Sequence, residues 1–480
     1  MRWKAHFFDN PNTVNSDHNN NYGFNSKRTP PQNNALIPFE NDLYDMINSI
    51  TFIKHKSSFQ KQLDKDVKSI QSSPDIFVPA DKTTNIYKVS PEVYKKLLHD
   101  NITASYEKTT PLKKHEIDSE AKTIAEPLKL DDRIECLAER EAFITLKDHK
   151  DNFNTTPKCR LLNPAKSEIG KVSKIHLQNI NEDVRKSLAL NQWRNTATVI
   201  NWFNNIQQKS QHRFLQLDIV EFYPSITENL LTRALTFAET LTPIHADTIG
   251  IIKHCRKSLL FAENSTWVKK NDNLFDVTMG SHDGAEICEM VGLYLLHEIT
   301  QKFPFINFGL YRDDGLGCHK SIPGPALERT KKQIIELFKA NGLRITIDTN
   351  MQQVNFLDVT LDLAKGKHWP FRKPNDKPLY IHRESNHPPN IKKELPEMIQ
   401  SRLSHLSSDK TEFDKAKQDY ETALSNSGFK EKLIYKQTEK PKRARTRNII
   451  YFNPPYNAAV STNIGHQFLS LIKKHFPKHH

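Results

Sequence analysis

Apolar residues recur along this chain in short runs that predict alternating strands and helices. The run at 214–220, Phe-Leu-Gln-Leu-Asp-Ile-Val, predicts a strand, and residues 285–300 carry apolar side chains at helical spacing. Residues 305–318 are apolar on both sides of a central Asp-Asp pair, which predicts a strand, a tight turn and a second strand. A helix at 325–340 and strands at 343–347 and 354–363 are predicted to follow. This order, with acidic residues where strands end, predicts an α+β domain.

The regions on either side carry further elements. Before residue 36 the sequence is rich in Asn, Pro and Ser without an apolar period, which is typical of disorder. The predicted elements are a helix at 38–47, a strand pair within 75–89, mostly helix over 91–140, a hairpin with a basic edge at 143–146 and 160–163, and helices over 391–435.

Composition narrows the class of protein. The 480 residues are 37% hydrophobic and 26% charged, with a formal net charge of +13, which makes nucleic acid the first partner to consider. A solvated basic surface is the alternative. The five cysteines are scattered and form no metal-binding spacing, which indicates a reducing intracellular compartment. No apolar stretch is long enough to predict a membrane span, and no secretory signal is visible at the N-terminus.

Three aspartates suggest the chemistry. Nucleotidyl transfer uses two divalent metals about 3.5–4 Å apart, so a protein that catalyses it needs carboxylates converging from separate strands. Asp218 ends a predicted strand, and Asp313 and Asp314 occupy the predicted turn between two apolar strands. Paired acids inside an apolar hairpin are unfavourable unless a cation meets them. An ordinary solvated Asp-Asp-Gly turn is the alternative when this pair is considered alone.

The wider sequence resembles reverse transcriptases, because five motifs follow one another in that family's order. Motifs A to E are matched by Asp218 with Phe222-Tyr223-Pro224-Ser225, Met279-Gly280-Ser281, Tyr311-Arg312-Asp313-Asp314, Asn341-Gly342-Leu343, and Asn355-Phe356-Leu357-Asp358. The resemblance implies an α+β right-hand polymerase fold, with fingers, a palm of antiparallel sheet plus helices, and a helical thumb. It also implies an RNA-directed DNA polymerase that takes an RNA template, a DNA primer and deoxynucleoside triphosphates.

The resemblance assigns roles residue by residue. Asp218 and Asp313 would be the main ligands of Mg²⁺ or Mn²⁺, with the carbonyl of Ile219, and Asp314 would be the third carboxylate. Tyr223 would be a steric gate against the ribose 2′-hydroxyl, although a core aromatic residue is the alternative. The remaining expected contacts are Gly280 and Ser281 at the nucleotide, and Phe356 and Leu357 at the primer.

Several basic residues are candidates for phosphate contacts. Lys147 and Arg160, in the predicted hairpin, are expected to meet the triphosphate, because Lys and Arg neutralise phosphate oxygens. The further candidates for nucleic-acid binding are Lys150, Lys158, Arg443 and Arg445. Surface cations are the alternative for each. The basic stretch 440–447 is equally compatible with a nuclear localisation signal and with a solvated linker.

Within reverse transcriptases, the sequence resembles those of Penelope-like retroelements. The matching features include Asp81-Lys82, Lys147-Asp148-His149-Lys150 and Ser385-Asn386-His387-Pro388-Pro389. Two departures stand out: Arg312 precedes the paired aspartates where retroviral enzymes have a small apolar residue, and His282-Asp283 replaces the usual proline after Ser281. Many such elements carry a C-terminal GIY-YIG endonuclease, which is not expected here, and no ribonuclease H signature is visible.

These expectations divide the chain into five parts. They are a disordered tail at 1–37, a helical extension of the fingers at 38–135, fingers and palm at 136–385, a thumb at 386–435 and a basic linker at 436–480. The protein is expected inside the cell, in the nucleus or the cytoplasm, without a membrane or an obligate protein partner. Two rival functions are an RNA-dependent RNA polymerase and a decayed or domesticated copy that binds nucleic acid without catalysis.

Overall fold

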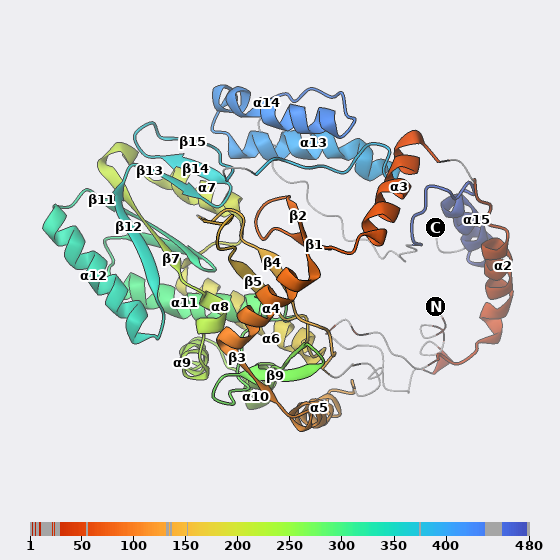
Figure 1. Ribbon diagram of the computed structural model, residues 1–480, viewed down its shortest axis with the longest axis horizontal. Helices are drawn as coiled ribbons and strands as arrows, with labels where there is room; N and C mark the ends of the chain where they lie inside the picture. Colours follow the sequence, from red (N-terminus) through yellow and green to blue (C-terminus); the bar gives the residue numbers. More distant parts are fainter. Residues whose placement is uncertain are drawn as a thin grey trace. The chain divides into compact units, whose positions relative to one another are not determined.

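The computed structural model describes residues 29–53, 56–130, 134, 137–150, 152–373, 376–436 and 454–477, and, near the N-terminus, Arg2, Ala5, Asp9, Asn10, Tyr22 and Phe24. The chain divides into two compact units (Figure 1). The larger comprises Pro74–Lys377 and Leu403–Ala416, and the smaller comprises Met1–Ser73, Pro378–Arg402 and Lys417–His480. Most of the tail expected to be disordered lies outside the described residues, as do Arg443 and Arg445.

The larger unit contains both strands and helices. Its strands are β1 (Ile76–Pro79), β2 (Ile86–Val89), β3 (Tyr106–Thr109), β4 (Phe143–Leu146), β5 (Cys159–Leu162), β6 (Asn191–Gln192), β7 (His212–Ile219), β8 (Leu260–Ala262), β9 (Ser265–Lys269), β10 (Asn307–Tyr311), β11 (Asp314–Lys320), β12 (Ile345–Met351), β13 (Gln353–Phe356), β14 (Val359–Asp362) and β15 (Lys367–Pro370). Its helices are α4 (Pro91–Ser105), α5 (Leu112–Ala125), α6 (Ile169–Leu188), α7 (Thr196–Asn205), α8 (Phe222–Ser225), α9 (Glu228–Glu239), α10 (Ala246–His254), α11 (Gly284–Lys302) and α12 (Gly324–Ala340).

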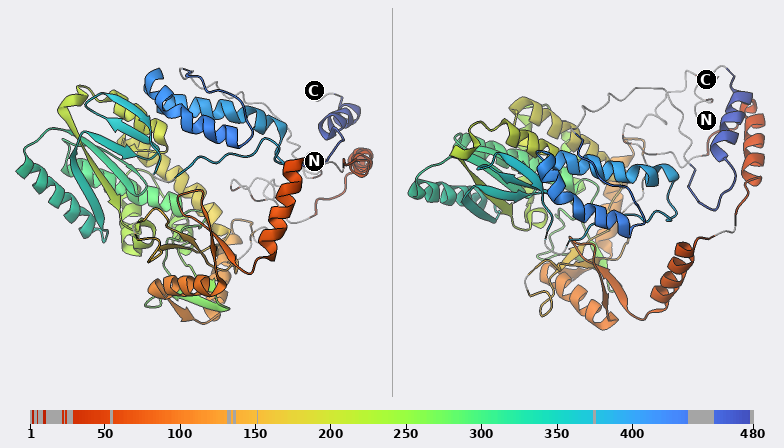
Figure 2. Two further views of the ribbon diagram at one scale, coloured as in Figure 1. Left: turned by 45° about the horizontal axis from the view of Figure 1, so that its top comes forward. Right: turned by 90° about the horizontal axis from the view of Figure 1, so that it is seen from above.

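A five-stranded sheet, called here the central sheet, organises the larger unit. Its strand order is β12-β7-β11-β10-β6, antiparallel except for the β10–β6 pair. Side chains alternate between the two faces of a strand, so Leu215, Leu217 and Ile219 of β7 share one face. They are buried in one core with residues of α6, α9, α11 and α12. Figure 2 shows α12 along the outer edge of this sheet, beside β12.

The other face of the central sheet packs differently. Phe214, Leu316 and Cys318 are buried there with residues of α7 and of a small sheet, β13-β14-β15. Asp218 is four residues from Phe214 along β7, so it shares this face. The acidic end of β7 therefore lies on the face that packs against α7 and the small sheet, opposite the layer formed by α6, α9, α11 and α12.

Two hairpins and a third small sheet complete the larger unit. β1 pairs with β2, β4 pairs with β5, and a parallel bridge from Ala80 to Leu146 joins the two hairpins. This confirms the strand pair predicted within 75–89 and the hairpin predicted from residue 143. The region 91–140 was expected to be mostly helical, but β3 interrupts it, because Tyr106–Thr109 pairs with β9 in a sheet of order β3-β9-β8.

The smaller unit contains α2 (Ile37–Asn48), which confirms the helix predicted at 38–47, and α3 (Ser58–Ser72). The chain was expected to be a basic linker from residue 436 on, yet Ile464–His475 form the helix α15. This helix forms because its apolar side packs on α2: Phe39 meets Phe468 edge to face at 6.5 Å between ring centroids. Lys474 also donates to Asp42 at 2.6 Å.

Two further helices, α13 (Pro389–Leu406) and α14 (Lys410–Asn426), confirm the helical pattern predicted over 391–435 and run from one unit into the other. None of the described helices is long and apolar enough to cross a membrane.

Candidate active site

Two of the three predicted aspartates lie directly opposite each other. β11 pairs antiparallel with β7 so that Asp314 is the partner of Asp218, and both side chains project from the face without the helix layer. Side chains opposed in this way have Cβ atoms about 4.5–5.5 Å apart. Asp313 lies in the turn between β10 and β11, and its carbonyl accepts a hydrogen bond from the Ile219 amide at 2.9 Å. The strand register therefore brings Asp218, Asp313 and Asp314 together.

The surroundings of this cluster make negative charge unfavourable. Burial raises the pKa of Asp314 to about 6, and the charges of Asp313 and Asp218 contribute to the same rise. Partial burial and the charge of Asp313 also raise the pKa of Asp218. In the described part of the chain, no group of three or more His, Cys, Asp or Glu side chains is arranged so that it could hold a metal ion.

Tyr223 lies beside the helix that follows the predicted motif B. It belongs to α8, five residues after Asp218, and its ring is packed against the main core. A methyl group placed on Gly284, the first residue of α11, would be 3.5 Å from the Tyr223 ring. Burial raises the pKa of the Tyr223 hydroxyl, so this group is a neutral hydrogen-bonding ring at physiological pH.

The backbone conformation at residue 280 favours glycine. Its φ of +111° is one that side-chain-bearing residues rarely adopt, and a Cβ at this position would be 3.0 Å from the carbonyl oxygen of Asn163. Asn163 follows β5, so Gly280 lets the loop before α11 approach the end of the β4–β5 hairpin. The Ser281 hydroxyl donates to the carbonyl of Thr278 at 3.1 Å and closes the same loop.

The sequence analysis missed a buried ion pair in this loop. Asp283 and Arg256 are each 1% exposed in their side chains and form a salt bridge. The Ser173 hydroxyl donates to the other carboxylate oxygen of Asp283 at 2.5 Å. Asp283 thus ties the loop to α6 and to the chain after α10. Residue type alone gave no signal, because the partners are distant in the sequence.

The β4–β5 hairpin carries the predicted phosphate contacts. Arg160 is committed to an ion pair with Asp81 at 2.7 Å. Lys147 is half-buried, and its pKa is lowered by that burial and by the nearby charge of Arg160. Lys150 and Lys158 are exposed. Lys147 has no salt bridge to any described carboxylate, whereas Arg160 is already paired with Asp81.

Two more lysines act on the carboxylates. The charges of Lys82 and Lys373 partly offset the rise in pKa at both Asp218 and Asp314, and Lys150 does so at Asp218. Lys82 lies between β1 and β2, and Lys373 follows β15. The sequence analysis noted Lys82 only as a family feature and overlooked Lys373, which lies outside every recognised motif.

The predicted primer contacts fall in the turn between β13 and β14. Phe356 is 1% exposed and packs edge to face on Trp193 at 5.4 Å, so its side chain belongs to the core as the chain is folded here. Leu357 is only partly buried and adopts a φ of +54° in the turn. Leu357 is therefore the better placed of the two to meet a nucleic acid.

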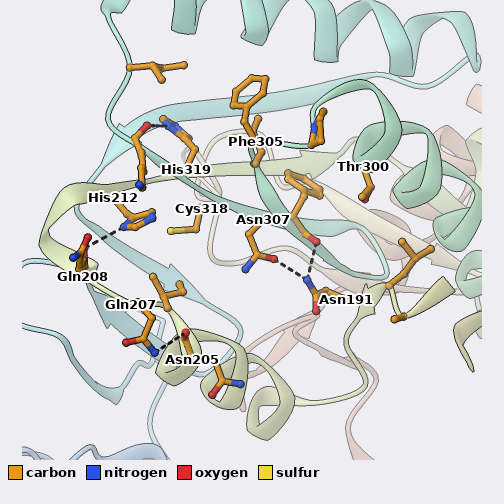
Figure 3. Close-up of a pocket in the computed structure, with 18 of the residues that line it drawn as sticks. Asn191, Asn205, Gln207, Gln208, His212, Thr300, Phe305, Asn307, Cys318 and His319 are labelled. Carbon is orange, nitrogen blue, oxygen red and sulfur yellow. Dashed lines mark hydrogen bonds between the residues drawn. The ribbon is translucent and has the colours of Figure 1, made fainter.

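A cavity of about 840 Å³ opens at the far end of the central sheet (Figure 3). Asn191 and Asn307, joined by a 2.9 Å hydrogen bond, lie in its wall with His319 and Lys320. Lys320 ends β11, six residues beyond Asp314, so about 20 Å of strand separates this cavity from the carboxylates. The cavity therefore belongs to a different part of the molecule.

Comparison with known proteins identifies the fold. The chain is similar to telomerase from Candida albicans, solved in complex with the TWJ fragment of telomeric RNA, with 10% identity and a TM-score of 0.52 over 78% of this chain. It spans 65% of that telomerase chain. Telomerase from Candida tropicalis (11% identity, TM-score 0.47, 75% of this chain and 66% of that chain) and the RNA-dependent RNA polymerase of a human picobirnavirus (10%, 0.41, 79% and 89%) also match. The first match shows a fold like that of this telomerase.

A model of an animal helix-turn-helix domain matches residues 379–439, which include α13 and α14. No curated protein matches the chain.

Proposed function

We propose that this chain is an RNA-directed DNA polymerase of a retroelement, acting by two-metal nucleotidyl transfer. The observation that carries the proposal is the pairing of Asp218 with Asp314 on neighbouring strands, with Asp313 in the connecting turn, in a fold like that of telomerase. In this proposal the central sheet is the palm, the β4–β5 hairpin belongs to the fingers, and α13 with α14 forms the thumb.

The carboxylates fit divalent metals that are shared with a substrate. Mg²⁺ is commonly held by one or two carboxylates together with substrate phosphates and waters, rather than by an all-protein cage. Asp218 and Asp313, with the carbonyl of Ile219, would be the main protein ligands, and Asp314 would lie nearer the primer end. Bound Mg²⁺ or Mn²⁺ would neutralise the triphosphate and acidify the primer 3′-hydroxyl.

Tyr223 favours DNA synthesis over RNA synthesis. It is held by core packing five residues after Asp218, so a ribose bound at the carboxylates would meet a fixed ring. A 2′-hydroxyl would add an oxygen where the ring leaves little room. Lys147 would present positive charge to the triphosphate. Arg160, which is held in place by its ion pair with Asp81, would offer its remaining N–H donors.

The test is primer extension on an RNA template with a DNA primer, deoxynucleotides and Mg²⁺ or Mn²⁺. We expect extension by the wild type and none by the Asp313→Asn, Asp314→Asn double variant. Extension with ribonucleotides alone would instead indicate an RNA polymerase. Absence of extension, with equal and salt-sensitive RNA binding by both proteins, would indicate a nucleic-acid-binding copy without catalysis.

The helices α13 and α14 are not assigned the main contact with nucleic acid. The sequence of α14 contains three lysines and four acidic residues, so this helix is not a basic element of the kind that usually dominates phosphate binding. We therefore assign nucleic-acid affinity chiefly to the cations near the carboxylates, with the stretch 440–447 as a further candidate. A Penelope-like origin and a nuclear location stay part of the proposal on the sequence resemblance alone.

A further inference from the structure

The loop between β1 and β2 is built around one buried carboxylate. Oδ2 of Asp148 accepts hydrogen bonds from the hydroxyl of Thr83 at 2.6 Å, the amide of Asn85 at 2.9 Å and the hydroxyl of Tyr87 at 3.0 Å. Three donors on one oxygen fix the path of the loop, because each bond to an ionised acceptor is stronger than a neutral one. Lys82 stands at the start of this loop and is exposed.

The same loop is anchored to the β4–β5 hairpin. The amide of Asp81 donates to the carbonyl of Leu146 at 2.8 Å, and the Asp81 carboxylate pairs with Arg160 at 2.7 Å. Lys82 lies between Asp81, which these contacts hold, and Thr83, which is bonded to Asp148. The position of Lys82 is thus a consequence of the hairpin, rather than that of a free surface lysine.

A second segment, which follows β15, carries Lys373. The amide of Phe371 donates to the carbonyl of Asp358 at 2.9 Å, which holds the segment against the turn that contains Leu357. Farther along, the carbonyl of Lys377 accepts from the hydroxyl of Thr84 at 3.4 Å. The segment therefore runs from the proposed primer contact to the loop that carries Lys82.

These tethers bring two like charges together. Desolvation lowers the pKa of Lys373 most, and the nearby Lys82 lowers it further, both by its charge and through side-chain contact. Neither lysine has a salt bridge to a carboxylate among the described residues. The charges of both lysines lower the pKa of Asp218 and Asp314, so both ammonium groups lie within electrostatic reach of these carboxylates. Burial and the charge of Lys82 outweigh the favourable charge of Asp314 at Lys373, so the two ammonium groups would gain from a further anion.

We propose that Lys82 and Lys373 form a clamp for a phosphate group of the substrate, joining the loop between β1 and β2 to the segment after β15. This proposal rests on the proposed function and deepens it by naming the group that is bound. Lysine ammonium groups are compact, strongly hydrated point charges that suit phosphate oxygens. The phosphate belongs either to the incoming nucleoside triphosphate or to the primer strand next to Leu357.

The experiment compares Lys82→Ala, Lys373→Ala and the double variant with a control, Lys331→Ala/Lys332→Ala, on the distant helix α12. One arm measures binding of an RNA–DNA primer–template by fluorescence anisotropy between about 50 and 200 mM salt, without nucleotide. The other arm measures the rise in Tm caused by deoxythymidine triphosphate with Mg²⁺. Neither arm requires turnover, and each variant alone should keep the wild-type Tm or exceed it, because a repulsion is removed.

We expect the double variant to bind one of the two ligands at least about tenfold more weakly than the wild type, because charge-assisted hydrogen bonds are lost. A loss confined to the primer–template, with a salt slope lower by about one per contact, assigns the clamp to the primer phosphate. A loss confined to the triphosphate assigns it to the nucleotide. Equal binding of both ligands by the double variant and the control overturns the clamp. Lys→Gln versions replace any alanine variant that does not fold.

Primer extension by the wild type, measured in parallel, separates this proposal from the proposed function. Extension by the wild type, together with unchanged binding by the double variant, rejects the clamp and leaves the polymerase standing. Weakened binding by the double variant, without extension by the wild type, supports the clamp and rejects catalysis by this chain.

Discussion

Replacement of Asp314 by asparagine should make the metal-free protein more stable while removing its activity. Asp314 faces Asp218 across two strands and has Asp313 beside it, so at neutral pH three carboxylates are held together. Asparagine has nearly the same shape and carries no charge. The substitution therefore removes repulsion and burial of a charge and leaves the strand pairing intact.

The magnitude follows from the pKa of Asp314. Burial and the two neighbouring acids raise this pKa from 3.8 to about 6. A difference of about two pH units corresponds to about 3 kcal/mol of cost for the ionised form. An amide that does not satisfy all its hydrogen bonds would offset about 1 kcal/mol of the gain. We expect a net stabilisation of about 1–2 kcal/mol at pH 7.5, which for a chain of 480 residues is a rise in Tm of about 1–2 °C.

The sign of the pH dependence is fixed by the same shift. Between pH 3.8 and about 6 the folded protein binds the Asp314 proton more tightly than the unfolded chain does. The stability associated with this proton is complete below pH 3.8 and is lost as the pH rises through about 6. Wild type and Asp314→Asn should thus have similar Tm values near pH 4 and diverge toward pH 7.5.

Differential scanning fluorimetry from pH 4 to pH 8, with and without 5 mM Mg²⁺, measures this. The control is Asp348→Asn, an exposed acid on β12 opposite the neutral Gln216, which should change stability by less than about 0.5 kcal/mol. Mg²⁺ should raise the Tm of the wild type and have less effect on Asp314→Asn. A variant that is less stable than the wild type at pH 7.5, or a gap that does not depend on pH, would show that the opposed carboxylates do not repel as argued.

Three further predictions test the surroundings of the site. Asp283→Ala should destabilise the protein by about 3–5 kcal/mol in urea unfolding, because the buried Arg256 loses its counterion; a loss below about 1 kcal/mol would refute the buried pair. Gly280→Ala should lower Tm and primer extension far more than Gly342→Ala, because only Gly280 has a carbonyl 3.0 Å from the added Cβ; equal effects would contradict this. Tyr223→Val should increase ribonucleotide incorporation at least about tenfold in single-nucleotide extension, and unchanged discrimination would exclude Tyr223 as the gate.

The elements around Asp218, Asp313 and Asp314 were predictable because their patterns are local. The apolar residues on both sides of Asp313 and Asp314 can be buried only if a strand, a turn and a strand form there, as β10 and β11 do. The alternation in β7 likewise places Leu217 and Ile219 in the core and Asp218 on the other face. Once both predictions hold, antiparallel pairing brings the acids together.

Features that depend on partners far apart in the chain could not be predicted. The residues of β3 form a strand only because β9, more than a hundred residues later, offers an edge. α15 has an apolar side, and the contact with Phe39 gives this side a place to pack. Lys373 gave no signal either, because its importance comes from the loop of Lys82, nearly three hundred residues earlier.

The acids and the lysines around the site form two separate sets of like charges. Acids on β7 and β11 repel one another, and lysines on two other segments repel one another, yet the two sets do not form salt bridges within the described chain. Hydrogen bonds to the carboxylate of Asp148 and to the carbonyl of Asp358 hold the two segments that carry these lysines. A metal-bound phosphate carries both complementary charges, positive toward the carboxylates and negative toward the ammonium groups. Under the proposed function, the arrangement would be complete only when a divalent metal and a phosphate are bound together, so either one should bind more tightly in the presence of the other.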